Sequence, residues 1–114
     1  MIGAVHPLPV KVIIEIIYLD KKDVERACRI CLHTGATFIK TGAGWADRWT
    51  SVEDIRVIKS LVDDEIKIKS SGGIRDLATL MSMYKEGATR FGVKLQSGIH
   101  IIEEAIGRGN QIQV

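Results

Sequence analysis

The sequence predicts an α/β fold in which parallel strands alternate with helices. Four short apolar stretches have the character of strands, and they cover residues 11–17, 37–41, 66–70 and 89–93. Each stretch is followed by a segment whose apolar residues recur at helical spacing. Strands that are separated by helices in this way favour right-handed crossovers, which produce a parallel sheet.

Each expected helix has a recognisable start or stop. The first begins near Asp20 and stops at Gly35. The second begins at Thr50 with Glu53 three residues later, which is the order of a capping box. The third follows Asp76. The apolar stripes are Val52, Ile55, Ile58 and Val62 in the second helix, Leu77, Leu80, Met81 and Tyr84 in the third, and Ile102, Ala105 and Ile106 in the fourth.

Two of the four units also share their letters. GATFIK (35–40) and GATRFG (87–92) each join a helix stop to a strand, two units apart, which indicates a barrel built from duplicated units. A complete barrel of eight such units typically holds about 250 residues. The 114 residues of this chain therefore predict a (β/α)4 half of a TIM barrel.

Composition limits the chain to one domain over residues 1–114, with residues 1–9 as an N-terminal extension. The net charge of +2, from 16 basic and 14 acidic residues, gives no basic stripe for nucleic acid. No apolar run approaches the roughly 20 residues that cross a membrane, and no secretion signal is visible. We therefore expect a cytoplasmic protein with no nucleic-acid or membrane partner.

Lys40 and Lys69 stand at the ends of consecutive strands, where parallel α/β folds build their sites. A lysine amine is a nucleophile only when it is uncharged, and a neighbouring ammonium together with desolvation favours the uncharged form. The pair fits a Schiff-base lysine with an electrostatic helper. The same spacing fits two solvated lysines equally well.

The stretch SSGGIRD, residues 70–76, places Gly72 and Gly73 between a strand and a helix N-terminus. Free backbone N–H groups there can hold an anion such as phosphate. A tight turn also needs glycine for its own geometry, so the motif gains force only beside the two lysines.

These motifs resemble, in order along the chain, the C-terminal half of deoxyribose-phosphate aldolase. The segments that carry the resemblance are VKVIIE (10–15), GATFIKTGAG (35–44), TSVEDIR (50–56), IKIKSSGGIRD (66–76) and EGATRFG (86–92). The resemblance implies a class I aldolase that cleaves 2-deoxy-D-ribose 5-phosphate reversibly to acetaldehyde and D-glyceraldehyde 3-phosphate, without metal or other cofactor. It implies that Lys40 is the Schiff-base lysine and that Lys69 tunes it. It also implies that Gly72 and Gly73 contribute to the phosphate site. We further expect phosphate or substrate contacts from Thr41, Lys94 and Ser97.

Three departures from the family pattern leave a second hypothesis open. The N-terminal half of the barrel, with an aspartate that takes part in proton transfer, has no counterpart here. TGAG (41–44) lacks a hydroxyl at its second position. The segment GVKLQSG (92–98) is longer than the family's phosphate loop, and its Lys94 either binds phosphate or lies on the surface. The chain could therefore be a non-catalytic fragment or pseudoenzyme that acts through assembly.

Lys67 shares its strand face with Lys69, because side chains alternate along a strand, and it would point into the barrel one layer lower. A buried unpaired ammonium is costly. Glu15 is the expected counter-ion if its strand faces inward at that position. Otherwise the interior is wetter than in the family.

Other polar and aromatic residues carry weaker signals. Cys28 and Cys31 form C-x-x-C, but their helical spacing and the lack of a second ligand pair favour core packing over redox or metal chemistry. The histidines have no metal or triad spacing, which favours surface or cap roles: His6, His33 and His100. Trp45 and Trp49 either form part of a wall of the substrate pocket, or they cover the exposed end of the core or make a subunit contact.

Four parallel strands leave two open edges and an inner face that we expect to be rich in Ile and Val. We therefore expect association, either as a homo-oligomer or with a separate N-terminal half. In a closed homodimer Lys40 and Lys69 would occur twice around one barrel mouth, and this repulsion favours a bound anion or back-to-back pairing.

Overall fold

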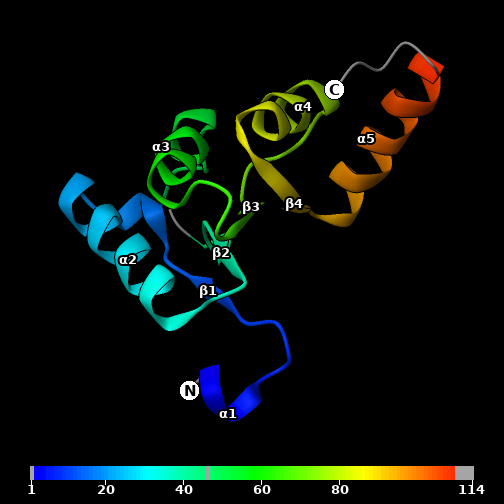
Figure 1. Ribbon diagram of the computed structural model, residues 1–114. Coiled ribbons are helices and arrows are strands. Elements are labelled where there is room, and N and C mark those ends of the chain that lie inside the picture. The colour runs from blue at the N-terminus through cyan, green and yellow to red at the C-terminus, as the bar shows by residue number, and fades with distance from the viewer. Residues whose placement is uncertain (1, 46, 110–114) are drawn as a thin grey trace.

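The computed structural model describes residues 2–45 and 47–109 (Figure 1). The strands are β1 (Lys11–Ile13), β2 (Phe38–Lys40), β3 (Lys67–Ser71) and β4 (Ala88–Gly92). The helices are α1 (Ile2–Val5), the 3₁₀-helix η1 (Ile16–Tyr18), α2 (Lys21–Thr34), α3 (Val52–Val62), α4 (Leu77–Glu86) and α5 (Leu95–Arg108). Residues 2–9, expected as an extension, thus hold the short helix α1.

The four strands form one parallel sheet in the order β1-β2-β3-β4, which confirms the predicted alternation of strands and helices. Figure 1 shows α2, α3, α4 and α5 arranged in chain order around the outer side of the strands. Each strand pairs with the strand of the next unit, as consecutive strands of a TIM barrel do. The strand ends and their following loops therefore gather at one end of the sheet.

The core lies between the sheet and its helices. Ile39 and Ile68 face each other across β2 and β3 and are fully buried. Ile55 and Ile58 of α3 are equally buried and belong to the same apolar cluster. This burial confirms the predicted apolar stripe of the second helix. Burying branched side chains of this kind is the main source of stability in such a layer.

The first strand is shorter than the sequence predicts. Pairing ends at Ile13, and Glu15 adopts a left-handed conformation with φ 47°. The chain then turns into η1, whose Ile16 enters the core. The apolar run 11–17 was predicted as one strand because its letters do not show where the chain leaves the sheet.

Helix α3 begins one residue later than predicted. Ser51, and not Thr50, is the N-cap: its Oγ accepts from the Asp54 N–H, and the Asp54 carboxylate accepts from the Ser51 N–H. The capping box is therefore Ser51 with Asp54. Thr50 is buried instead and hydrogen-bonds to the end of β3.

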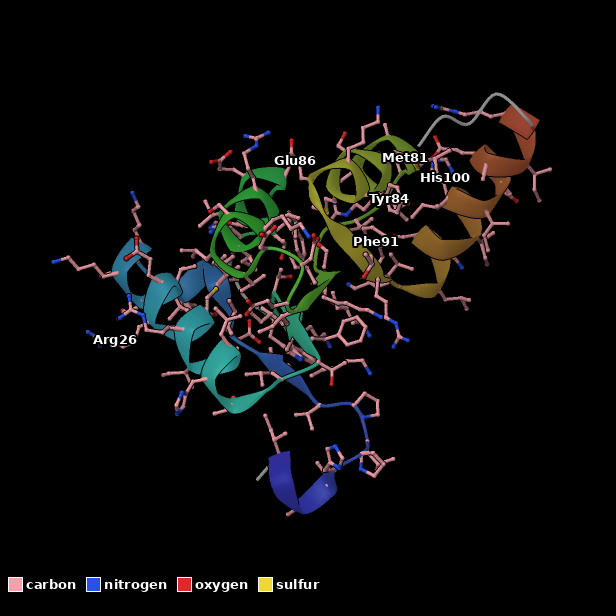
Figure 2. The ribbon with its side chains drawn as sticks, viewed as in Figure 1. Arg26, Met81, Tyr84, Glu86, Phe91 and His100 are labelled. Atoms are coloured by element: carbon pink, nitrogen blue, oxygen red, sulfur yellow. The ribbon has the colours of Figure 1, made fainter. Side chains whose placement is uncertain are left out.

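The apolar stripes of α4 and α5 are partly different from the prediction. Met83 is buried in α4, whereas Tyr84 is 43% exposed. In α5 the buried residue is Ile101, whereas Ile102 and Ile106 are 60% and 74% exposed. Figure 2 shows Met81, Tyr84, Phe91 and His100 on the side of the molecule where α4 and β4 approach α5. A hydrogen bond of 2.7 Å from the Leu77 N–H to Glu104 Oε2 ties α5 to the start of α4.

The two glycines of the repeated segments have the same role in both units. Gly35 and Gly87 are the C-caps of α2 and α4, with φ of 77° and 122°. Gly87 directly precedes β4, and Gly35 lies three residues before β2 begins. Only glycine reaches such values without strain. The repeated letters GAT thus mark a repeated helix stop.

Candidate functional site

Lys40 and Lys69 lie side by side on β2 and β3. Lys40 ends β2 as predicted, whereas Lys69 is the middle residue of β3, because that strand continues to Ser71. Their Cα atoms are register partners, and both side chains are partly buried. Burial lowers the pKa of Lys69, and the positive charges of Lys40, Lys11 and Arg90 lower it further. Lys69 therefore lies among positive charges that make the loss of its proton easier.

A cleft of about 350 Å³ opens at these strand ends. Its lining residues come from the loops after β2, β3 and β4 together with the ends of the strands. They are Lys40, Ala43, Gly44, Trp45, Trp49, Ser71, Gly72, Gly73, Ile74, Arg75, Gly92, Val93, Lys94 and Ser97. The lining includes three cationic side chains and no carboxylate among the described residues, so its chemistry suits an anionic ligand.

The Gly72–Gly73 turn shapes one side of the cleft. Both residues have positive φ, 103° and 78°. Trp49 packs directly on Gly73, where a Cβ atom would overlap the indole side chain. The Arg75 guanidinium in turn lies 4.9 Å from the Trp49 ring centroid. Trp49 therefore serves as a wall, which agrees with the first of the two roles considered for it.

Lys94 and Ser97 line the cleft from the segment after β4. Lys94 is exposed and occupies the N-cap position of α5, and Ser97 is half-buried. Trp45 also lines the cleft but is 90% exposed. The cleft therefore brings together Lys40, Gly72, Gly73, Lys94 and Ser97, which the sequence singled out.

Thr41 stands apart from that group. Its side chain is fully buried and does not line the cleft. Its Oγ1 accepts from the Ser71 N–H at 3.0 Å and lies 2.9 Å from Thr50 Oγ1. These bonds tie the loop after Lys40 to the end of β3.

Ser71 and Arg75 are cleft residues that sequence reasoning missed. Ser71 is 7% exposed, and its Oγ has no hydrogen-bond partner among the described residues. It lies against Gly92, where a side chain would collide with that Oγ. The available signal was the position of both residues within SSGGIRD, where Ser71 directly precedes the two glycines and Arg75 follows them by two residues.

Glu15 is not the counter-ion of Lys67, contrary to the expectation from the sequence. Its left-handed turn carries it beyond the end of β1, and its Oε1 accepts from the Ala43 N–H at 2.8 Å. Lys67 lies at the opposite end of the sheet, where its register partner is Phe38. The carboxylate therefore holds the loop after Lys40.

The cysteines and histidines form no second site. Cys28 and Cys31 are free thiols in the core, and burial raises the pKa of Cys28 to about 11. Core packing is thus confirmed. Within residues 2–45 and 47–109 no cluster of His, Cys, Asp and Glu is suited to a metal ion. None of the helices described there has the length and apolar character needed to span a membrane.

Comparison with known proteins identifies close relatives. No protein-family model matches the sequence. The deoxyribose-phosphate aldolase of Aquifex aeolicus (strain VF5) is 49% identical over 106 residues, which are 93% of this chain and 46% of the relative. The chain is therefore a relative of the deoxyribose-phosphate aldolases. It spans about half the length of the curated relatives that it matches.

Solved aldolase structures agree with this relationship. The aldolase QR15 superposes with a TM-score of 0.81 at 47% identity, over 90% of this chain and 46% of that one. The deoxyribose-phosphate aldolase of Aeropyrum pernix, described as tetrameric, superposes with a TM-score of 0.75 at 26% identity, over 84% and 41% of the two chains. The four β/α units thus correspond to half of an aldolase TIM barrel, as the sequence predicted.

Proposed function

We propose that this chain carries the lysine-bearing half of a class I aldolase site of the deoxyribose-phosphate aldolase type. The observation that supports this most strongly is the pairing of Lys69 with Lys40, which lines a cationic cleft. The substrate in the proposal is 2-deoxy-D-ribose 5-phosphate, and the products are acetaldehyde and D-glyceraldehyde 3-phosphate.

In the proposed reaction the uncharged amine of Lys40 attacks the aldehyde carbon of the open-chain sugar. Water leaves, and a protonated imine forms. The imine then accepts the electron pair of the C2–C3 bond, which breaks as the C3 hydroxyl loses its proton and becomes the aldehyde of the departing product. The remaining enamine is protonated at C2, and hydrolysis of the imine releases acetaldehyde.

Lys69 supports these steps through its amine. Its pKa is lowered by burial first and by the neighbouring cations second, so it can lose its proton more readily than an ordinary lysine. An uncharged Lys69 can accept a proton beside Lys40, and it does not repel the positively charged imine on Lys40. Lys40 is the nucleophile in this account, and Lys69 is its electrostatic partner and proton carrier.

The phosphate of the substrate is assigned to the opposite side of the cleft. The positive-φ turn at Gly72 and Gly73 lines the cleft with backbone, whose N–H groups suit a phosphate, and Arg75, Lys94 and Ser97 add cationic and hydroxyl groups. Thr41 takes a positioning role in the proposal, because its hydroxyl is already engaged by Ser71 and Thr50.

The proposal also includes an oligomeric or paired state and a cytoplasmic location. The alternative is a non-catalytic protein that acts through assembly. It is favoured by one observation: no carboxylate lines the cleft among the described residues. In that case the lysines would hold a phosphorylated ligand without turning it over.

Release of acetaldehyde from 2-deoxyribose 5-phosphate, coupled to alcohol dehydrogenase and loss of NADH absorbance, distinguishes the two functions. We expect Lys40→Ala to abolish the release and Lys69→Leu to lower its rate by about 10²-fold or more while the melting curve is retained. Lys22→Ala, an exposed residue of α2, is the matched control and should keep the full rate. A wild-type signal that survives in Lys40→Ala would contradict the aldolase assignment.

A further inference from the structure

The side of the sheet that faces away from the helices is lined with positive charge. Lys40, Lys69 and Arg90 are register partners across three neighbouring strands, and Lys11 and Lys67 flank Phe38 one layer below. The prediction that the inner face is rich in Ile and Val is therefore wrong, because mainly charged side chains line it. The branched apolar side chains of β2 and β3, Ile39 and Ile68, point to the helices instead.

Phe38 occupies the centre of this cationic face. Lys11 Nζ, Lys67 Nζ and the Arg90 guanidinium carbon lie 5.7, 5.8 and 4.7 Å from its ring centroid. Their side chains leave only 4% of Phe38 exposed. Such contacts offset a small part of the repulsion between the cations but neutralise no charge.

None of these five cations takes part in an ion pair within residues 2–45 and 47–109, although other cations of the chain do. Arg48, Arg56 and Lys59, for example, each bond a carboxylate on the helix side. The carboxylates of the ion pairs in the described chain thus belong to its helices and helix ends. The inner face is left with a charge that its own chain does not balance.

Apolar surface flanks both open edges of the sheet. Beside β4, helix α5 exposes a stripe at helical spacing: Leu95, Ile99, Ile102 and Ile106. Beside β1, Ile13 and Ile30 are 47% and 57% exposed next to a hollow between β1 and α2. Both edges therefore present unpaired backbone groups together with apolar helix surface, which is what an added β/α unit would cover.

We propose that this face docks a parallel sheet, flanked by its own helices, whose inward side chains include carboxylates at the level of Lys11, Lys67 and Arg90. The charge decides between occupants. A second copy of this chain would bring ten cations into one barrel interior, where repulsion is only weakly screened. An acid-bearing sheet would pair the same edges, cover the same helix stripes and neutralise the interior.

The proposed carboxylates belong to the lower layer of the interior. Although Arg90 is in register with Lys69, its guanidinium lies over Phe38, so it joins Lys11 and Lys67 there. Lys40 and Lys69 remain at the upper layer beside the cleft. This inference depends on the charge and shape of the face and not on the aldolase reaction.

A charge-swap experiment with the whole chain tests the proposal. The variant Lys67→Glu/Arg90→Glu supplies the acid-lined half-barrel, and it is mixed with the wild-type chain in native mass spectrometry and sedimentation equilibrium. We expect a 1:1 heterodimer with a Kd at least about tenfold lower than that of wild-type self-association, weakening as salt is raised. The matched control Lys22→Glu/Arg29→Glu makes the same change of charge on the outer side of α2 and should give no such preference.

A neutral variant tests the same proposal in case the charge-reversed variant does not fold. Lys67→Gln/Arg90→Gln removes the repulsion without adding carboxylates, so we expect it to self-associate more tightly than the wild type. The proposal would be overturned if the wild type and Lys67→Gln/Arg90→Gln self-associated equally tightly. A closed wild-type dimer as tight as the charge-swapped heterodimer would also overturn it and would identify a second copy as the occupant.

Discussion

At the scale of single residues, the cleft depends on the close contact between Trp49 and Gly73. The indole lies where any side chain at position 73 would be, and the Arg75 guanidinium covers the ring from another side. Arg48 fixes the same segment, since it donates to the Trp49 carbonyl oxygen at 3.0 Å and to both Asp54 carboxylate oxygens. The wall of the cleft is therefore built by packing against a glycine.

Gly73→Ala should therefore do more damage than its backbone conformation alone predicts. A left-handed conformation costs a non-glycine residue about 1–2 kcal/mol. Overlap with Trp49 should raise the total loss in the free energy of unfolding to about 3 kcal/mol. Urea denaturation of the variant measures this loss, and Trp49 fluorescence reports the displaced indole.

Gly35→Ala is the matched control for that prediction. Gly35 has φ 77°, against 78° at Gly73, but no atom lies within 4 Å of the position a Cβ would take. Its loss should stay near the conformational cost of about 1–2 kcal/mol. Equal losses at both positions would show that the contact with Trp49 does not matter.

Local sequence signals predicted part of the site but not all of it. Lys40 and Lys69 could be placed together, because equivalent positions on consecutive parallel strands are neighbours. Arg90 could not. A bulge opposite Ile68 and Lys69 adds one residue to β4, so Arg90 and not Thr89 shares the face of Lys69. A bulge leaves no clear mark in the letters.

At the scale of elements, the start of α3 couples secondary structure to the cleft. Ser51 and Asp54 cap each other, and Asp54 also holds Arg48. Burial alone would raise the pKa of Asp54, but its bonds to Arg48 and Ser51 outweigh burial and lower that pKa below the ordinary value of 3.8. One carboxylate thus fixes both the helix end and the Trp49 segment.

This lowered pKa makes a prediction about acid stability. Because the pKa of Asp54 is lower in the folded than in the unfolded chain, its contribution is complete above about pH 4 and is lost as the pH falls through the folded value. Asp54→Asn should cost about 1 kcal/mol at pH 6 and less at pH 3. Urea denaturation at both values measures the difference.

Asp47→Asn provides the control for the acid prediction. Asp47 is an exposed residue of the same loop, so the substitution should change the free energy of unfolding by less than about 0.5 kcal/mol at either pH. A cost of Asp54→Asn that stayed constant between pH 6 and pH 3 would show that its carboxylate is not stabilised in the folded chain.

Helices were easier to predict than the ends of strands, for physical reasons. The caps Asp20, Gly35, Asp76 and Gly87 act locally, so their letters are sufficient. The burial of Ile101 in place of Ile102 depends on how α5 lies against α4, through contacts distant in sequence such as Leu77 with Glu104. Tertiary packing therefore decides which of the several apolar residues of α5 is buried.

At the scale of the whole molecule, the chain is half of a barrel. Helices cover the outer side of its sheet, and no element of the described chain covers the inner side. Its helices and the outer side of the sheet share one core, whereas its inner face carries five cations, three of which lie over Phe38. The alternation of strands and helices predicted this architecture. The charge of the inner face was harder to foresee, because strands this short alternate over only two or three residues per face.

The central claim is that Lys40 reacts as an amine, and imine trapping tests it most directly. The chain is incubated with acetaldehyde, reduced with borohydride and digested, and the modified lysines are located by peptide mass mapping. Lys22→Ala serves as the matched variant. We predict that the adduct concentrates on Lys40 and that Lys40→Ala loses it without increased labelling elsewhere. An adduct spread evenly over the exposed lysines, and unchanged in Lys40→Ala, would contradict the account.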